Sequence, residues 1–170
     1  MACAEDAKAV ADLHAESWRR HYRGAYLDSF LDGDVFTDRR KVWSERLSHP
    51  KPEDFTLVAD DQGNLAGFVH TIMRHDPRFG ALLDNLHVRY DSKRRGIGKA
   101  LMREAARILI ERSPGSGLYL WVLDQNKDAQ TFYSNLGGVC AGCEILGPFP
   151  GGGTAPGLRM HWPDPRAILQ

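Results

Sequence analysis

Apolar side chains recur every three or four positions in the first fifty residues, which is the spacing of one face of a helix. This pattern predicts a helix from Asp6 to about His21 and a shorter one over Arg40–Leu47. The segment His49–Pro52 is expected to end the second helix, because proline lacks the backbone donor that a helix needs. The chain is therefore expected to begin with helices that each bury one face.

Farther along the chain, short apolar runs alternate with turn residues, and two amphipathic patterns interrupt them. Helices are expected over Lys99–Arg112 and Asn126–Leu136, with Gly137 as the C-terminal cap of the second. Strands are expected at Phe55–Ala59, Leu65–Met73, Ala81–Val88, Leu118–Leu123, Val139–Ile145 and Gly157–Trp162. A strand–helix–strand–helix centre with hairpins at both ends indicates a mixed α/β or α+β fold.

Composition narrows the class of protein. The chain has 170 residues, enough for one domain over 1–170, and 42% hydrophobic and 26% charged residues exclude a disordered chain. The formal net charge is zero, which disfavours a nucleic-acid binder. No run is apolar enough to cross a membrane, and Met1–Lys8 lacks the apolar core of a secretory signal, so a cytoplasmic protein is expected.

The segment Leu86–Leu101 carries the strongest chemical signal. It predicts a strand, a basic turn and a helix, with Gly96 and Gly98 leaving the backbone of the turn open to a ligand. Free amides at a helix N-terminus suit a pyrophosphate, and four side chains add positive charge: Lys93, Arg94, Arg95 and Lys99. A solvated basic loop that only caps the helix is the alternative interpretation.

Three phosphate-binding patterns can be compared with this turn. A Walker A loop would need glycine at Lys93 and serine or threonine at Ala100, so it does not fit. A dinucleotide fingerprint would need glycine or alanine at Leu101, so it does not fit either. The pattern R/Q-x-x-G-x-G/A fits, with Lys93 at its first position in place of arginine or glutamine.

A second motif follows over Val122–Gly137 and matches V-x-x-x-N-x-x-A-x-x-F-Y-x-x-x-G at every specified position. In this order, the two motifs resemble those of the GCN5-related N-acetyltransferase (GNAT) family, and the resemblance covers nearly the whole chain. It implies a mixed, mostly antiparallel sheet flanked by helices, with a splayed parallel pair formed by Ala81–Val88 and Leu118–Leu123. The first strand of the family would precede Asp6, where it must be absent, truncated or very short.

The resemblance also implies where acetyl-CoA binds as co-substrate, with no metal involved. The pantetheine arm would lie between the splayed strands and pair with the backbone of Leu86, His87 and Val88. Asn126, an apt helix N-cap, would also hydrogen-bond this arm. The pyrophosphate would lie against the turn, which comprises Lys93, Arg94, Arg95, Gly96, Ile97, Gly98 and Lys99.

Catalytic roles are implied for Tyr133 and Asp84. Tyr133, next to the cofactor, would return a proton to the departing CoA thiolate, although its position on the apolar stripe of its helix also suits a core residue. Asp84 is the expected base for the amine, and His87, His70, a water chain or an already neutral amine are alternatives. The glutamate base of some relatives is missing, because Trp121 stands at its position.

One cysteine pair could suggest other chemistry. Cys140 and Cys143 form a C-x-x-C, but a structural zinc site would need two further ligands at a matching spacing. Residues three apart in a regular strand point to opposite faces. These side chains are therefore expected to be packing thiols rather than metal ligands or redox groups.

The predicted function is direct transfer of an acetyl group from acetyl-CoA to a primary amine of a small molecule or peptide. Trp18, Tyr22 and Tyr26 are expected to line the acceptor pocket, although Trp18 suits the core equally well. A non-catalytic acyl-CoA-binding module on the same fold is the alternative. The expected partners are acetyl-CoA and an amine, without nucleic acid or membrane, and an open sheet edge beside Phe55–Ala59 favours a homodimer.

Overall fold

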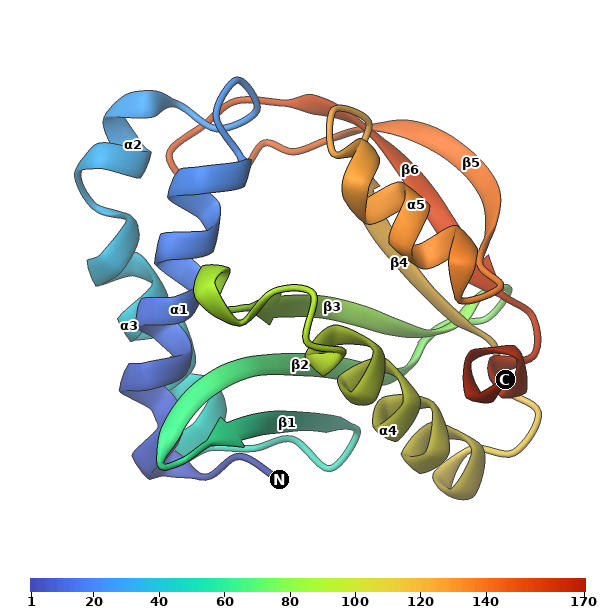
Figure 1. The fold of residues 1–170 in the computed structure, drawn as a ribbon. Helices are drawn as coiled ribbons and strands as arrows, with labels where there is room; N and C mark the ends of the chain where they lie inside the picture. Colours follow the sequence, from blue (N-terminus) through green and yellow to red (C-terminus); the bar gives the residue numbers. More distant parts are fainter.

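A six-stranded sheet in the order β1-β2-β3-β4-β6-β5 runs through the computed structural model, which describes residues 1–170 (Figure 1). Only β3 and β4 run parallel, and all other neighbours are antiparallel. This arrangement confirms the predicted mixed, mostly antiparallel sheet. The strands are β1 (Asp54–Asp61), β2 (Asn64–Asp76), β3 (Gly80–Val88), β4 (Leu118–Leu123), β5 (Val139–Leu146) and β6 (Ala155–Trp162).

Two helices, α3 and α4, begin earlier than the sequence pattern indicates, and α2 was not predicted. They are α1 (Ala7–His21), α2 (Asp28–Asp32), α3 (Val35–Ser48), α4 (Ile97–Arg112) and α5 (Lys127–Asn135), with short 3-10 turns at Ala4–Asp6, Tyr90–Ser92 and Pro165–Leu169. The helix α2 has only five residues, too few to show a helical period. The expected start of α3 at Arg40 was late by more than one turn, because the polar run Thr37–Lys41 separates Val35 and Phe36 from the apolar residues farther along the helix.

Helices cover both faces of the sheet. Because side chains alternate along a strand, neighbouring residues of β2 face opposite layers. Val69 is buried with Leu101 and Leu109 of α4 in the larger core, whereas Phe68 is buried with Trp43 of α3 in a second core beneath α1 and α3. Figure 1 shows α4 and α5 on one side of the sheet, with α1 and α3 packed together at its other side.

The parallel strands β3 and β4 separate soon after they meet. They pair only at Ala81 with Leu118 and at Leu82 with Tyr119. Farther along, β4 stays paired with β6, and β3 stays paired with β2. The predicted splayed pair is therefore confirmed, and the opening lies between the C-terminal halves of these strands.

A β-bulge in β3 sets which side chains face this opening. Thr71 of β2 lies opposite Leu83 and His70 lies opposite Asn85, so Asp84 is an extra residue. Leu83 packs in the core on the α4 side, whereas Asn85 and its neighbour Asp84 both line a cavity on the other side. A bulge allows two successive residues to face the same side, which a regular strand does not.

The outer edge of β1 meets only a short piece of chain before α1. The backbone N–H of Ala2 donates to the carbonyl oxygen of Thr56 over 2.8 Å, and no strand precedes the helix. Residues 1–170 therefore hold no strand before α1, and Ala2 makes one backbone hydrogen bond to the edge of β1. At the other edge of the sheet, β5 is exposed along most of its length.

The expectation for the cysteine pair was wrong. A register shift between Cys140 and Cys143 places them opposite Met160 and Leu158, which lie two apart on β6 and so share a face. Both thiols are exposed rather than packed. No group of three or more His, Cys, Asp or Glu side chains is gathered so that it could hold a metal ion.

Membrane insertion can be assessed from the helices. None of them combines the length and the apolar character that a bilayer crossing requires. The cytoplasmic location stays a prediction from the sequence.

Candidate active site

The turn before α4 presents backbone donors to an anion. Arg94 and Gly96 both adopt left-handed backbone conformations, with φ of 62° and 81°. The first hydrogen bond within the helix runs from the Ala100 N–H to the Gly96 carbonyl, and no backbone N–H from Arg94 through Lys99 donates to a protein acceptor. Free amides at a helix N-terminus attract negative charge, so the turn fits a pyrophosphate.

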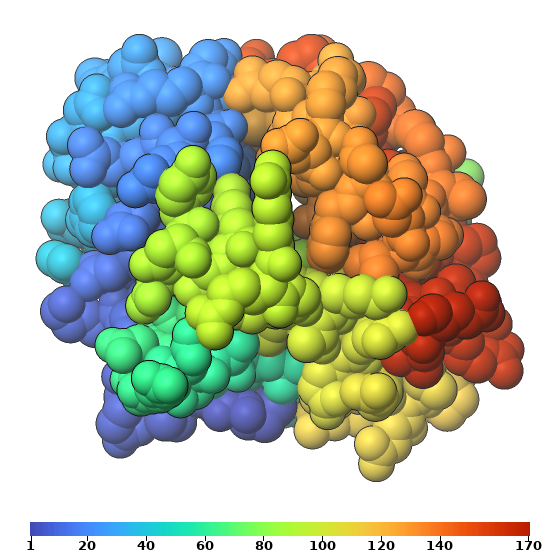
Figure 2. All heavy atoms as spheres, in the orientation of Figure 1, coloured from blue at the N-terminus to red at the C-terminus, as the bar shows by residue number.

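Two side chains of this turn already contact other protein groups, whereas its backbone amides do not. Arg95 forms an ion pair with Asp61 over 2.7 Å, and the Lys93 ammonium lies 2.8 Å from Nε2 of His21. The exposed side chains of Arg94 and Lys99 form no ion pair. In Figure 2, a recess separates this yellow-green segment from α5, in orange.

The edge of β3 that faces the opening is free of strand partners. Leu86, His87 and Val88 pair with β2 on one side, but β4 has already diverged on the other. Unpaired backbone groups at such an edge can bind an extended ligand as an added strand would. Across the opening, Oδ1 of Asn126 accepts a hydrogen bond from the N–H of Ala129 over 3.2 Å, which confirms the predicted N-cap of α5.

Gly98 lies where α4 approaches α5, and we expect Gly98→Val to weaken acetyl-CoA binding about tenfold or more. A Cβ at this position would lie 3.4 Å from Phe132 and 3.7 Å from Val88, so larger side chains would enter the recess. Loss of close backbone contact to a phosphate removes charge-assisted hydrogen bonds, each of which contributes about 1.5–3 kcal/mol. Isothermal titration calorimetry with acetyl-CoA measures the change.

The matched control for this variant is Gly115→Val, in the turn after α4. Gly115 has a φ of +82° and no atom within 4 Å of its would-be Cβ, so the substitution costs stability without touching the recess. Its affinity for acetyl-CoA should equal that of the wild type. Equal affinity in folded Gly98→Val would mean that the cofactor binds elsewhere.

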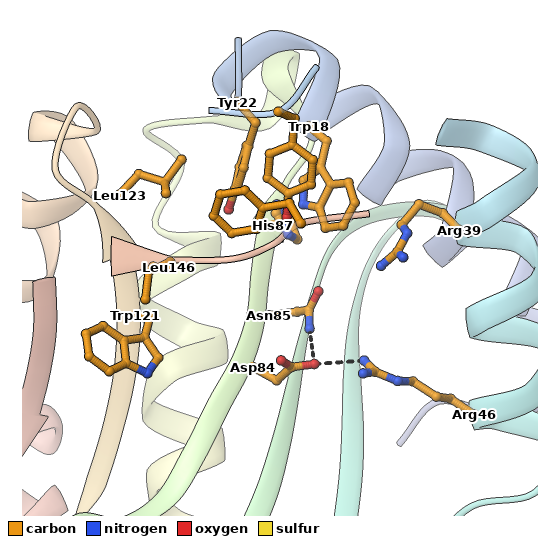
Figure 3. Close-up of a pocket in the computed structure, with 12 residues that line it drawn as sticks. Trp18, Tyr22, Arg39, Arg46, Asp84, Asn85, His87, Trp121, Leu123 and Leu146 are labelled. Atoms are coloured by element: carbon orange, nitrogen blue, oxygen red, sulfur yellow. Dashed lines mark hydrogen bonds and ion pairs between the residues drawn. The ribbon is translucent and has the colours of Figure 1, made fainter. Parts of the chain in front are cut away.

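A cavity of about 270 Å³ lies on the other side of the splayed strands. Its walls come from both β3 and β4 and from α1, α3 and the β5–β6 loop (Figure 3). Trp18, Tyr22 and Tyr26 line it, as predicted from the sequence. The remaining lining residues are Arg39, Arg46, Asp84, Asn85, His87, Trp121, Leu123, Leu146 and Phe149.

The glycine-rich β5–β6 loop closes one end of this cavity by packing against the α1–α2 segment. Phe149 stacks on Tyr26, with ring centroids 4.3 Å apart. A Cβ at Gly151 would lie 2.4 Å from the Cβ of Phe30, and one at Gly153 would lie 2.6 Å from a backbone oxygen. Such close approach is possible only for glycine. The loop composition was visible in the sequence, but its partner was not.

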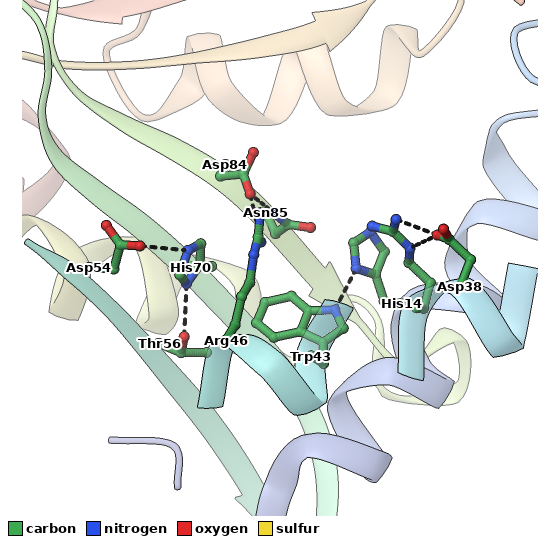
Figure 4. Close-up of polar contacts among 10 residues, drawn as sticks. His14, Asp38, Trp43, Arg46, Asp54, Thr56, His70, Asp84 and Asn85 are labelled. Carbon is green, nitrogen blue, oxygen red and sulfur yellow. Dashed lines mark hydrogen bonds and ion pairs between the residues drawn. The ribbon is translucent and has the colours of Figure 1, made fainter. Parts of the chain in front are cut away.

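Asp84 is held at the edge of the cavity by two neighbours. Its Oδ2 accepts hydrogen bonds from Nη1 of Arg46 over 2.8 Å and from Nδ2 of Asn85 over 2.5 Å (Figures 3 and 4). The side chain is 29% exposed, so a substrate can reach its remaining oxygen. The expected base is therefore placed in the cavity, in an ion pair that the sequence did not indicate.

Sequence reasoning missed both arginines of the cavity. Arg39, Trp43 and Arg46 are spaced to share one face of α3, and Trp43 is fully buried. Its indole N–H donates to Nδ1 of His14 over 2.9 Å, which fixes the rotation of the helix (Figure 4). The spacing of two arginines around a buried tryptophan was a signal, but charged side chains on a helix usually face solvent.

The two histidines considered as alternative bases are weakly basic here. His87 lines the cavity, and its Nδ1 lies 2.8 Å from the hydroxyl of Ser17. Burial, with His21 and nearby cations, lowers the pKa of His87 to about 3. His70 is buried outside the cavity lining, bonded to Thr56, and burial lowers its pKa to about 4. Neither imidazole would hold a substrate proton near neutral pH.

Tyr133 is half-buried on α5, next to Phe132 and Trp162, with ring centroids 5.2 Å and 6.1 Å away. Its hydroxyl has no hydrogen-bond partner in the protein, so it is free for a ligand. Burial, and the nearby phenol of Tyr22, raise the pKa of Tyr133. The phenol therefore keeps its proton throughout the physiological range.

Comparison with known proteins gives the family. Residues 10–137 match the acetyltransferase (GNAT) family. An uncharacterized N-acetyltransferase, YuaI of Bacillus subtilis, is 24% identical over 124 residues, which are 72% of this chain and 69% of YuaI.

Solved structures of N-acetyltransferases are also similar to this chain. The PaiA N-acetyltransferase of Thermoplasma acidophilum, in complex with coenzyme A, is similar over 94% of both chains, with a TM-score of 0.70 and 20% identity. The ribosomal-protein-S18-alanine N-acetyltransferase of Escherichia coli is 26% identical, with a TM-score of 0.59, over 74% of this chain and 76% of that one. The family match and this geometry place the chain in the GNAT family of N-acetyltransferases.

Proposed function

We propose that the protein transfers an acetyl group directly from acetyl-CoA to a primary amine of a small molecule or peptide. The observation that carries this proposal is the opening between β3 and β4. Free amides and an unpaired strand edge lie on one side of it, and a cavity with a carboxylate lies on the other. An amine in the cavity would meet a thioester in the opening without a covalent enzyme intermediate, since both cysteines of β5 lie outside the cavity lining.

The proton transfers can be assigned to two side chains. The ammonium of the acceptor would lose a proton to Asp84, and the neutral amine would attack the thioester carbonyl. As the new C–N bond forms and the C–S bond breaks, the CoA thiolate would take a proton from Tyr133. The nitrogen of the new amide would give up its second proton to the Tyr133 phenolate, which restores the phenol. The same burial that raises the pKa of Tyr133 also disfavours a thiolate, so the proton affinities of donor and acceptor rise together.

Acetyl-CoA is the proposed co-substrate, bound by the turn from Lys93 to Lys99, the edge of β3 and Asn126. The relative from Thermoplasma acidophilum, of the same fold, was solved with coenzyme A. The chemistry assigned to Asp84 and Tyr133 is complete without a metal ion.

The direct experiment measures CoA thiol release from acetyl-CoA in the presence of amines of different classes. The panel includes amino acids, polyamines, aminoglycosides and peptide N-termini. Turnover with any of them supports the proposal. Tight acetyl-CoA binding without turnover across the panel would favour a non-catalytic acyl-CoA-binding module, and no binding at all would overturn both functions.

We also propose that the outer edge of β1 pairs with a second copy of the chain. Thr56 and Val58 point their backbone groups outward from the sheet, and only Ala2 occupies part of this edge. Light scattering at micromolar concentration should then give twice the 19.0 kDa mass of one chain. Val58→Pro removes an outward N–H and should yield monomers. A strict wild-type monomer would refute this pairing.

A further inference from the structure

We infer that the acceptor amine carries an acidic group, which binds to the guanidinium of Arg39. This inference rests on the proposed N-acetyltransferase function and specifies the substrate class of the same cavity. It follows from the hydrogen bonding of Arg39, from the balance of charge in the cavity wall and from the aromatic side chains around it.

Arg39 is a buried cation, and one nitrogen of its guanidinium has no acceptor in the protein. The residue is 7% exposed, and its guanidinium lies 4.2 Å from the ring centroid of Trp18. Nε and Nη2 both point to the carboxylate of Asp38, the adjacent residue in the helix. Nη1 has no acceptor in the protein, although the side chain lines the cavity (Figure 3). Nη1 is not enclosed by the protein, so a ligand in the cavity can accept a charge-assisted hydrogen bond from it.

The cavity wall has more positive than negative groups. Its charged residues are Arg39, Arg46 and Asp84, and the low pKa of His87 keeps that imidazole neutral. Asp84 already pairs with Arg46, and Asp38 lies outside the lining. A polyamine or an aminoglycoside would therefore bring several cations to a site with one carboxylate. A zwitterion, by contrast, can direct its ammonium to Asp84 and its acidic group to Arg39.

Aromatic side chains form much of the rest of the wall, beside Leu123 and Leu146. Trp18, Tyr22 and Tyr26 face Trp121 and Phe149 around the cavity. Flat, apolar surfaces of this kind suit an apolar or aromatic body, and the planar guanidinium suits a carboxylate or a phosphate. The class of acceptor is thus an amine that carries an acidic group on an apolar body, as in an aromatic amino acid.

The test compares matched acceptors in the thiol-release assay. The acceptors form two sets, and within each set the aromatic body is the same and only the acidic group differs. One set is phenylalanine, its methyl ester and phenethylamine, and the other is tryptophan, its methyl ester and tryptamine. We expect kcat/KM for the acids to exceed that of the esters and amines by about tenfold or more, since a charge-assisted hydrogen bond is lost in the latter. Aminophosphonate analogues of the same bodies distinguish a carboxylate site from a phosphate site.

Variants assign the preference to one side chain. Arg39→Met should bring the ratio of acid to ester close to one, mainly through KM for the acid. Arg40→Met is the matched control, because Arg40 is an exposed neighbour that pairs with Asp12 over 2.8 Å outside the cavity, and it should keep the wild-type ratio. If Arg39→Met does not fold, Arg39→Lys is the second variant. It keeps the charge but loses the paired donors of the guanidinium, so it should lower the ratio of acid to ester in part.

The outcomes separate the two proposals. Turnover of the neutral bodies or of polyamines in preference to the acids would overturn this inference and leave N-acetyl transfer intact. A folded Arg39→Met that retains the acid preference would overturn the role of Arg39. Acetyl-CoA binding without turnover of any amine would instead overturn the proposed function.

Discussion

Tyr133→Phe should lower kcat by roughly 10²-fold while stability and acetyl-CoA affinity stay close to those of the wild type. The substitution keeps the ring and its packing against Phe132 and Trp162, and it removes only a hydroxyl that has no partner in the protein. Because the proton is needed only as the thiolate leaves, kcat and kcat/KM should fall together. Steady-state kinetics and a thermal melt of the same preparation measure both expectations.

The chemistry of the leaving group provides the control for Tyr133. Acyl donors whose thiol is more acidic need less help from a proton donor, so the defect should shrink with them. A purely structural tyrosine would show no such dependence on the donor. Normal turnover by the variant would remove Tyr133 from the mechanism and leave water as the proton source.

Asp84→Asn should lower kcat/KM by roughly 10²-fold, the low end for loss of a positioned base. The amide can still contact Arg46 and Asn85, but it cannot accept a proton from the acceptor ammonium. Raising the pH should restore part of the rate, because more of the amine is then neutral. Asp60→Asn, near the end of β1 and outside the cavity lining, is the matched control and should leave kinetics unchanged.

The pH profile separates Asp84 from His87. Because the pKa of His87 is lowered to about 3, its imidazole is already neutral at pH 5 and adds no titration between pH 5 and pH 9. Any rise or fall of the rate with pH in this range then reports the titration of another group or of the substrate amine. If Asp84→Asn kept the wild-type rate, a water chain or an already neutral amine would be the better account of deprotonation.

Local chemistry made several features predictable from the sequence. The glycines and free amides before α4, the N-cap Asn126 and the aromatic pair Trp18 and Tyr22 at the end of α1 depend on residues close together in the chain. The strands and long helices follow from apolar periodicity in the same way, which is why their order and the class of fold were correct. The short helix α2 was missed because five residues hold too little of that period.

Tertiary structure alone decided the shape and charge of the acceptor cavity. The bulge at Asp84 arises from pairing with β2, and the shift that places Cys140 and Cys143 on one face arises from pairing with β6. Arg39 and Arg46 face the cavity because Trp43 is buried against His14, a residue far away in sequence. A sequence pattern gives the period of an element, but its rotation and register are set by contacts with distant partners. Those contacts, not the motifs, place the acidic and basic groups that an acceptor would meet.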